Sequence, residues 1–158
     1  MDHQFNSSDK LFRWLHPGQF NWEEMRPTSA AFTDPYMSVD IDSLTTLEES
    51  YHRAQQAGKT AVVALTVEMV IEKDLRVCHC PTSTLKNSPE SLVCISDEGC
   101  PSYRNNVSPE SIVCINDAHG CVIGKKTNHI KKFLAKHCKV EVYPPQHTSS
   151  NSETESEQ

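Results

Sequence analysis

The chain has 158 residues, the length of one ordinary domain, and a net charge of −6 at neutral pH. Hydrophobic residues make up 37% of it and charged residues 23%, as in a somewhat polar globular protein. This weak acidity excludes a whole-protein argument for binding nucleic acid or an anionic membrane surface. We expect a flexible N-terminus (residues 1–10), a single domain (11–145) and a disordered acidic tail (146–158) rich in Ser, Thr and Glu.

The N-terminal sequence predicts neither export nor membrane insertion. Its first ten residues contain no basic n-region and no apolar h-region, so it does not resemble a signal peptide. The longest apolar run, residues 61–65, is too short to cross a bilayer. The seven cysteines are an odd number, and we predict reduced thiols in a cytoplasmic protein rather than a disulfide framework.

The first half of the chain predicts two strands and one clear helix. Residues 11–15 and 37–39 are the strands, and a loop punctuated by proline separates them. Thr45 and Glu48 fit a capping box at the start of a helix over residues 45–57. Four apolar side chains share one face of that helix at spacings of three and four residues: Leu44, Leu47, Tyr51 and Ala54.

The second half predicts further elements of both kinds. They are a buried strand, a short helix capped by Thr66, another strand, a last helix capped by Thr127 and a closing strand: residues 60–66, 67–73, 75–78, 128–137 and 140–143. The whole pattern predicts an α+β fold, with a mixed, mainly antiparallel sheet, two main helices and one short helix.

An internal repeat lies between the two halves. Residues 88–97 read SPESLVCISD and residues 108–117 read SPESIVCIND, with eight of ten positions identical at an offset of 20 residues. Each copy predicts a Ser-Pro-Glu turn that leads into a short apolar strand, residues 92–95 and 112–115. Two copies are too few for a solenoid. Either the two strands pair as neighbours, or one copy is an insertion that duplicates the other.

Polar residues gather in the N-terminal half. Arg13 stands inside an apolar strand, with Phe12 and Trp14 on the opposite side, so it requires an acidic partner or an anionic ligand. A salt bridge to Asp34 or Glu48 and a ligand-binding role are both open. The predicted ligand-binding residues are Arg13, Arg26, Thr28, Ser29 and Asp34.

Cysteine and histidine residues form a second candidate site. Zinc takes four nitrogen or sulfur ligands, usually from paired C-x(2–4)-C motifs, and this sequence has none. Cys94 and Cys114 lie in apolar strands, where cysteine packs as a small hydrophobic residue. Packing and metal binding are the two alternatives. The metal ligands would come from the loop residues, which are Cys80, Cys100, His119 and Cys121.

A run of lysines follows the repeat. It contains no acidic residue and comprises Lys125, Lys126, Lys131, Lys132, Lys136 and Lys139. The run suits either a surface that faces nucleic-acid phosphates or a solvated helix face. The second interpretation is favoured, because only Phe133 interrupts the run with an aromatic side chain and it is expected to point inward.

The N-terminal pattern LFRWLHP…W…RPTSAAFTD…MSVD resembles a small bacterial family of uncharacterised proteins. Those proteins share an arginine-bearing first strand, an R-P-[ST]-S-x-A-F segment and a Met-Ser-Val strand, and the likeness covers about residues 11–95. The family tends to have a histidine where this chain has Ser91 and Ser111, and the second repeat copy is a further departure. The resemblance implies a bacterial or phage setting and a compact α+β fold, and it implies no activity.

A fold-level analogy links the same segment to RES-domain and ADP-ribosyltransferase-like proteins, which consume NAD. It implies that Arg13 or Arg26 grips the NAD phosphates and that Ser38 orients the ribose. Glu48 or Glu49 would then stabilise the oxocarbenium-like ribose.

The sequence therefore predicts a small cytoplasmic binding or accessory protein of a bacterial or phage operon. It would act through a protein partner or an anionic ligand at Arg13 and Arg26. The alternatives are an NAD-consuming enzyme with Glu48 and Ser38 as catalytic residues, a zinc-stabilised interaction module, and nucleic-acid contact through residues 125–139.

Overall fold

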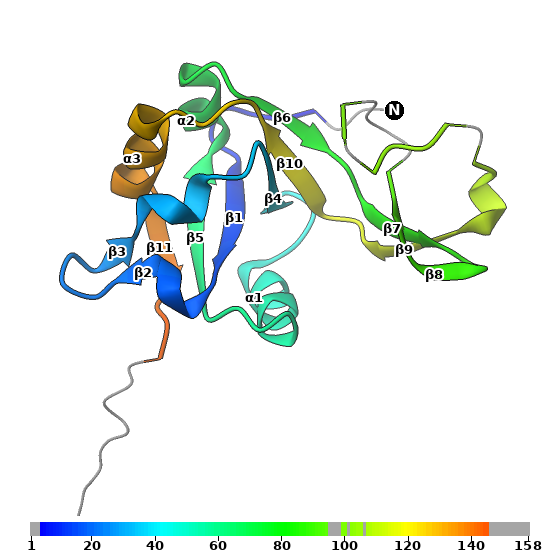
Figure 1. Ribbon diagram of the computed structural model, residues 1–158, viewed down its shortest axis with the longest axis horizontal. Helices are drawn as coiled ribbons and strands as arrows, with labels where there is room; N and C mark the ends of the chain where they lie inside the picture. Colours follow the sequence, from blue (N-terminus) through cyan, green and yellow to red (C-terminus); the bar gives the residue numbers. More distant parts are fainter. Residues whose placement is uncertain (1–3, 95–98, 101, 106, 146–158) are drawn as a thin grey trace, which may run out of the picture.

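The computed structural model describes residues 4–94, 99–100, 102–105 and 107–145 (Figure 1). The predicted tail, 146–158, and the end of the first repeat copy lie outside this part of the chain. The predicted fold class is confirmed, because helices stand beside a mainly antiparallel sheet. None of the described helices is long and apolar enough to cross a membrane.

A six-stranded sheet forms the centre of the molecule (Figure 1). In spatial order its strands are β11 (Lys139–Val142), β5 (Ala61–Thr66), β1 (Lys10–Leu15), β4 (Tyr36–Ile41), β10 (His119–Ile123) and β6 (Arg76–His79). Every ladder of this sheet is antiparallel. A short hairpin of β2 (Phe20–Asn21) and β3 (Arg26–Pro27) lies apart from it.

Helices cover both faces of the sheet. Helix α1 (Leu47–Gln56) packs on β1 and β5 from one side. On the other side lie α2 (Val67–Glu72), α3 (Asn128–His137) and the 3-10 helix η2 (Ser29–Phe32). Strand β5 is therefore apolar on both faces: Val62 packs in the α1 layer and Val63 in the opposite layer.

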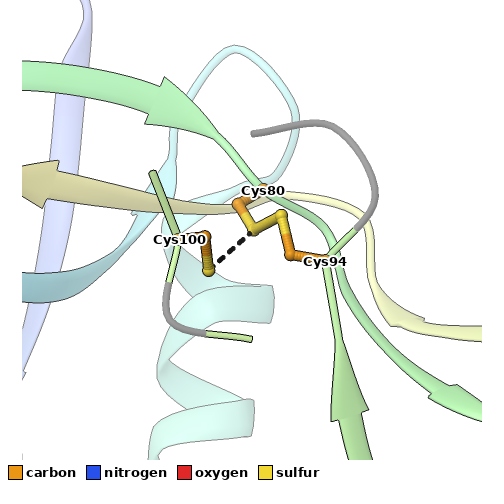
Figure 2. Close-up of side chains that lie close together, drawn as sticks. All are labelled: Cys80, Cys94 and Cys100. Atoms are coloured by element: carbon orange, nitrogen blue, oxygen red, sulfur yellow. Dashed lines mark hydrogen bonds between the residues drawn. A yellow bond between two sulfur atoms is a disulfide. The ribbon is translucent and has the colours of Figure 1, made fainter. Parts of the chain in front are cut away.

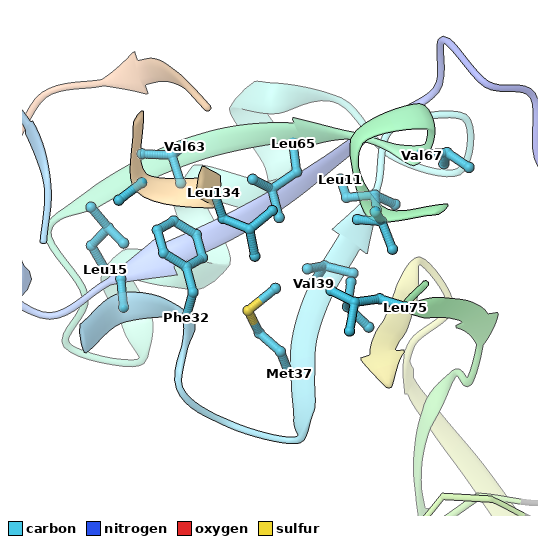
Figure 3. Close-up of a cluster of buried hydrophobic side chains, with 14 of the residues drawn as sticks. Leu11, Leu15, Phe32, Met37, Val39, Val63, Leu65, Val67, Leu75 and Leu134 are labelled. Carbon is cyan, nitrogen blue, oxygen red and sulfur yellow. The ribbon is translucent and has the colours of Figure 1, made fainter. Parts of the chain in front are cut away.

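The larger core lies between the sheet and the layer of α2, α3 and η2 (Figure 3). Its fully buried side chains interdigitate from strands and helices, and they include Leu11, Leu15, Phe32, Met37, Val63, Leu65 and Leu134. Truncating one such leucine to alanine typically costs about 2–5 kcal/mol. This core holds the central strands in place.

The described part of the N-terminus also contacts this core. Phe5 packs against it, and the Asp9 carbonyl accepts a 3.0 Å hydrogen bond from the Val67 amide. The Ser7 carbonyl accepts another at 3.0 Å from Glu68. Residues 5–9 thus lie along the start of α2.

The predicted cap of α1 is wrong by one residue. Thr46, not Thr45, is the N-cap, and its hydroxyl accepts a 3.1 Å hydrogen bond from the Glu49 amide. The Glu49 carboxylate accepts in return from the Thr46 amide at 3.3 Å. Glu48 is exposed and takes no part in the box. Gly58 follows the helix in the left-handed region, with φ of +78°.

The other predicted helices agree with the structure. Thr66 caps α2 by accepting from the Met69 amide, and Thr127 caps α3 by accepting from the Ile130 amide. Helix α3 has the predicted bounds, Asn128–His137. The five strands predicted outside the repeat, over residues 11–15, 37–39, 60–66, 75–78 and 140–143, appear with bounds that shift by up to two residues.

A second, three-stranded sheet extends from the ends of β6 and β10 (Figure 1). Its spatial order is β8 (Ser88–Val93), β7 (Thr82–Leu85) and β9 (Ile112–Asn116). The two repeat copies therefore do not pair with each other, since each pairs with β7 on a different side. Their Ser-Pro-Glu segments also differ: the first lies in β8 and the second opens the 3-10 helix η3 (Pro109–Ser111).

Candidate functional site

A cavity opens where two central strands of the large sheet separate. Strand β1 pairs with β5 over six residues but with β4 only at Leu11 and Phe12. Beyond Phe12 the cavity has a volume of about 400 Å³. Its lining comes from β1, β4 and the adjoining loops, and it comprises Phe12, Arg13, Trp14, His16, Asp34, Ser38, Val39, Asp40, Lys59 and His119.

Arg13 spans the separation between β1 and its neighbours. Its Nε donates to the Ala31 carbonyl at 3.1 Å, and its Nη1 donates to the Ser38 carbonyl at 3.0 Å. These bonds use two of the five N–H donors of a guanidinium. Among the described residues, no carboxylate lies within 4.0 Å of it, so neither predicted salt bridge forms. Burial lowers the pKa of Arg13, and the charge of Asp34 opposes that shift.

Lys59 brings a second cation to the cavity. It follows α1, is half-buried, and places its Nζ 2.8 Å from the Nε2 of His16. Burial lowers the pKa of Lys59, and the positive charge of Arg13 lowers it further. No ion pair joins Lys59 to a carboxylate among the described residues. Two cations that repel one another therefore line the same cavity.

The buried carboxylate of Asp40 accepts several hydrogen bonds on the wall of the cavity. This buried carboxylate accepts from the Ser50 hydroxyl at 2.7 Å, from Arg53 at 2.8 Å and from the Asn116 amide at 2.9 Å. The Trp14 indole donates to Ser50 at 2.9 Å. Asp40 is 1% exposed, so these partners offset the cost of its buried charge. The network is structural, and it fixes the Trp14 ring in the lining.

Only part of the predicted ligand set meets at this cavity. Arg13, Asp34 and Ser38 line it. Arg26 lies in β3, forms an ion pair with Glu24 at 2.5 Å, and does not line the cavity, in so far as its lining is described. Thr28 and Ser29, which precede and begin η2, are also not among the described lining residues. Lys59, which lines the cavity, is not among the ligand-binding residues predicted from the sequence.

The predicted catalytic pair is not brought together. Ser38 lines the cavity, and its carbonyl accepts from Arg13. Glu48 and Glu49 are exposed on the first turn of α1, and neither is among the described lining residues. Hydrogen bonds from the Thr46 amide and the Thr45 hydroxyl lower the pKa of Glu49. Its carboxylate is thus engaged in the helix cap.

Three cysteines converge at the junction of the two sheets (Figure 2). The Sγ atoms of Cys80, Cys94 and Cys100 all lie within 4.8 Å of one another, and all three residues are buried. Cys80 and Cys94 form a disulfide, contrary to the prediction of reduced thiols, and the Cys100 thiol lies 3.5 Å from Cys80 Sγ. Cys94 was predicted to be a packing residue, and it is instead the third member of this group.

Two other predicted metal ligands lie nearby. Cys121 belongs to the same buried cluster of cysteines. His119 places its Nδ1 2.7 Å from the Cys80 carbonyl. A second cavity of about 280 Å³ is lined by Cys80, Cys100, Cys121 and His119, among others. Ser38 and His119 line both cavities, so the two cavities are neighbours.

The lysine run is not a uniform surface. Lys126 is 6% exposed, and its ammonium group donates to the Val122 carbonyl at 2.6 Å and to the Pro35 carbonyl at 3.1 Å. Lys132 and Lys136 are exposed on α3, as a solvated helix face requires. One member of the predicted phosphate-facing run is therefore a buried structural cation.

No protein-family model matches this chain, and no curated protein or solved structure shows significant similarity to it.

Proposed function

We propose that the protein binds a small ligand carrying an oxyanion, a phosphate or a carboxylate, in the cavity between β1 and β4. The observation that carries this proposal is the pair of half-buried cations, Arg13 and Lys59, in one cavity without a carboxylate within 4.0 Å among the described residues. An anion bound beside such cations stabilises their charged forms, because it replaces the hydration that burial removes.

The balance of charge in the lining supports an anion. Asp40 faces the cavity but is already bonded to Arg53 and Asn116. Asp34 remains as the acidic group whose charge raises the pKa of Arg13, against the effect of burial. Trp14 and Phe12 add an apolar wall, and a volume of about 400 Å³ suits a small organic anion. The ligand site thus combines two cations, a hydroxyl-bearing residue and aromatic surface.

The proposal narrows the expectation drawn from the sequence. Arg13 supports an anionic ligand, whereas Arg26 has its own partner in Glu24. An NAD-consuming reaction would need Glu48 or Glu49 beside the ligand, and both are exposed on α1 outside the described lining. We therefore propose binding rather than catalysis. A protein partner and a bacterial operon remain expectations from the sequence.

Thermal unfolding in the presence of defined anions tests the proposal. The probes are inorganic phosphate, pyrophosphate, citrate and NAD. At 100 times its dissociation constant, a ligand specific for the folded state adds about 2.7 kcal/mol, which raises Tm by roughly 5–10 °C in a protein of this size. At least one probe should produce such a shift.

Matched variants then locate the binding site. Lys59→Gln removes a cation of the cavity and should weaken binding of the active probe about tenfold or more. Lys132→Gln removes an exposed lysine of α3 and should leave the response unchanged. A response that is equal in the wild type and in Lys59→Gln, or no response to any probe, would contradict the proposal.

A further inference from the structure

We infer that the reduced chain binds a thiophilic metal ion, with zinc as the first candidate, through Cys80, Cys94 and Cys100. This inference is independent of the proposed anion site. The three sulfur atoms lie within 4.8 Å of one another at the junction of the two sheets (Figure 2).

The spacing of the sulfurs fits a tetrahedral thiolate site. Zinc–sulfur bonds of about 2.3 Å place two ligands of a tetrahedron roughly 3.8 Å apart. The Cys80 and Cys100 sulfurs are 3.5 Å apart, so only a small adjustment would admit an ion. Zinc binding would displace the three thiol protons to solvent. The Cys80–Cys94 disulfide uses two of the same sulfurs, so the metal and the disulfide exclude one another.

The small core at the junction of the two sheets consists mainly of cysteines, so a disulfide or a metal would add stability to this region. The core beneath the junction consists of five buried cysteines, with Tyr103 and Ile123 packed against them. Among the described residues, the buried side chains of the large core are aliphatic and aromatic ones together with Met37, and none of them is a cysteine. The small sheet of β7, β8 and β9 adjoins this sulfur-rich core, and small units with little apolar core usually require a disulfide or a metal.

The repeat supplies an internal comparison. Cys94 and Cys114 occupy the same position in the two copies, within the shared segment Val-Cys-Ile. Cys94 is 1% exposed and lies in the sulfur group, whereas Cys114 is exposed on β9. The local sequence alone would treat both residues alike. Cys94 is buried because its strand ends beside Cys80 and Cys100.

The fourth coordination position has room beside the group. Cys80 and Cys100 line the cavity of about 280 Å³, together with Cys121 and His119. Both of the latter carry donors that zinc accepts, and His119 is oriented by the 2.7 Å contact of its Nδ1 with the Cys80 carbonyl. The site is thus three thiolates with a fourth position facing a partly polar cavity.

Metal titration of the full-length protein, reduced with a phosphine and freed of metal with a chelator, tests the inference. Cobalt(II) should produce the intense ligand-to-metal charge-transfer absorption of cobalt thiolates, saturating at one ion per chain, and zinc should abolish it. Cys94→Ser and Cys100→Ser should weaken binding by at least about a hundredfold, since each removes a direct ligand. Cys114→Ser is the matched control and should bind as the wild type does.

A second measurement covers variants that fail to fold. In the wild type, one equivalent of zinc should protect Cys80, Cys94 and Cys100 from alkylation while Cys114 remains reactive, as read by peptide mass spectrometry. The inference is overturned if reduced, folded protein gives no thiolate absorption with cobalt. It is equally overturned if zinc protects none of the three cysteines, or if the Cys94 and Cys114 variants bind cobalt alike.

Discussion

Lys126 holds its ammonium group inside the protein, bonded to the Val122 and Pro35 carbonyls. Burial lowers its pKa from an ordinary 10.5 to about 8, and the charge of Arg13 acts in the same direction. Asp34 and Cys121 favour the charged form and oppose this shift. The protonated form is therefore less favourable in the folded protein than in the unfolded chain.

The sign of the resulting pH dependence follows from proton binding. Between pH 8 and about 10.5, the unfolded chain binds more protons at Lys126 than the folded protein does, so this residue makes stability rise with pH. In Lys126→Met that contribution is absent. Urea unfolding of both proteins from pH 7 to 10 should show the wild type gaining stability relative to the variant. Parallel pH profiles for the two proteins would contradict this prediction.

Cys138 provides a second test at the scale of single residues. Burial raises the pKa of its thiol to about 12, so little thiolate exists near neutrality. Cys114 is exposed. Iodoacetamide at pH 8 should label Cys114 readily and Cys138 slowly in the folded protein, as measured by peptide mass spectrometry. Both should react alike in urea, and equal labelling rates in the folded protein would show that Cys138 is accessible.

At the scale of elements, the cap of α1 distinguishes two adjacent glutamates. The Glu49 carboxylate accepts from the Thr46 amide and from the Thr45 hydroxyl, whereas Glu48 is exposed. Glu49→Ala should lower the free energy of unfolding, because it removes half of a capping box. Glu48→Ala is the matched control and should change it by less than about 0.5 kcal/mol. Chemical denaturation measures both, and the reverse order would restore the box predicted from the sequence.

Gly120 of β10 lies close to both neighbouring strands, β6 and β4. A Cβ atom at this position would lie 2.7 Å from the Cys78 carbonyl oxygen and 2.9 Å from Cδ1 of Ile41. Gly120→Ala should therefore destabilise the protein by about 1–3 kcal/mol, through displacement of the backbone. Gly18→Ala meets no described atom within 4 Å and should be nearly neutral. A neutral Gly120→Ala would mean that the β6–β10 ladder relaxes freely.

The helices and central strands could be predicted because their signals are local. Thr127 and the apolar spacing behind it defined α3 to the residue. The cap of α1 was misplaced because Thr45 and Thr46, followed by Glu48 and Glu49, offer two overlapping boxes. Strand β7 was not predicted, since the segment Thr-Ser-Thr-Leu becomes a strand only between its two partners.

The candidate site was harder to predict because its residues meet through distant pairings. Arg13 was found because an arginine inside an apolar strand is a strong local signal. Lys59 gave no such signal, because it reaches the cavity through a contact with His16, 43 residues earlier. Cys94 and Cys114 share one sequence context and differ only in tertiary position. The nearly identical sequence around each residue does not show which of the two cysteines is buried.

At the scale of the whole molecule, the two sheets rest on unequal cores. The large sheet covers an extensive apolar core, while the small sheet adjoins a cluster made mainly of cysteines. Leu92, Val113 and Ile115 of the small sheet are 45–60% exposed. The small sheet should therefore open more readily than the large one, because fewer buried contacts oppose its opening.

Hydrogen exchange under reducing, metal-free conditions tests this difference. Amides of β7 and β8 should exchange faster than those of β1 and β5, which pair with each other over six residues and pack against the large core. Mass spectrometry of proteolytic fragments gives the rates, and residual protection in β1 and β5 should match the global free energy of unfolding. Equal protection in both sheets would show that the molecule opens as a single cooperative unit.

The duplicated segments lie on either side of β7, so the fold must determine which copy pairs with which edge of that strand. Eight of ten residues are identical, yet the copies pair with β7 in registers that differ by one residue. Ser83 lies opposite Val93 in the first copy and opposite Cys114, the counterpart of Cys94, in the second. Asn116 bonds Asp40 at 2.9 Å and ties its copy to the large sheet, and the matching position of the other copy holds Ser96, whose side chain is shorter. The Asn116 side-chain amide therefore favours the second copy at the edge of β7 that adjoins the large sheet. Without this bond, the one-residue difference in register would still separate the two copies, and a slip of one residue would exchange the faces that they present. Loss of the bond would thus favour pairing of β7 with the equivalent segment of another molecule, which is a route to strand-swapped dimers.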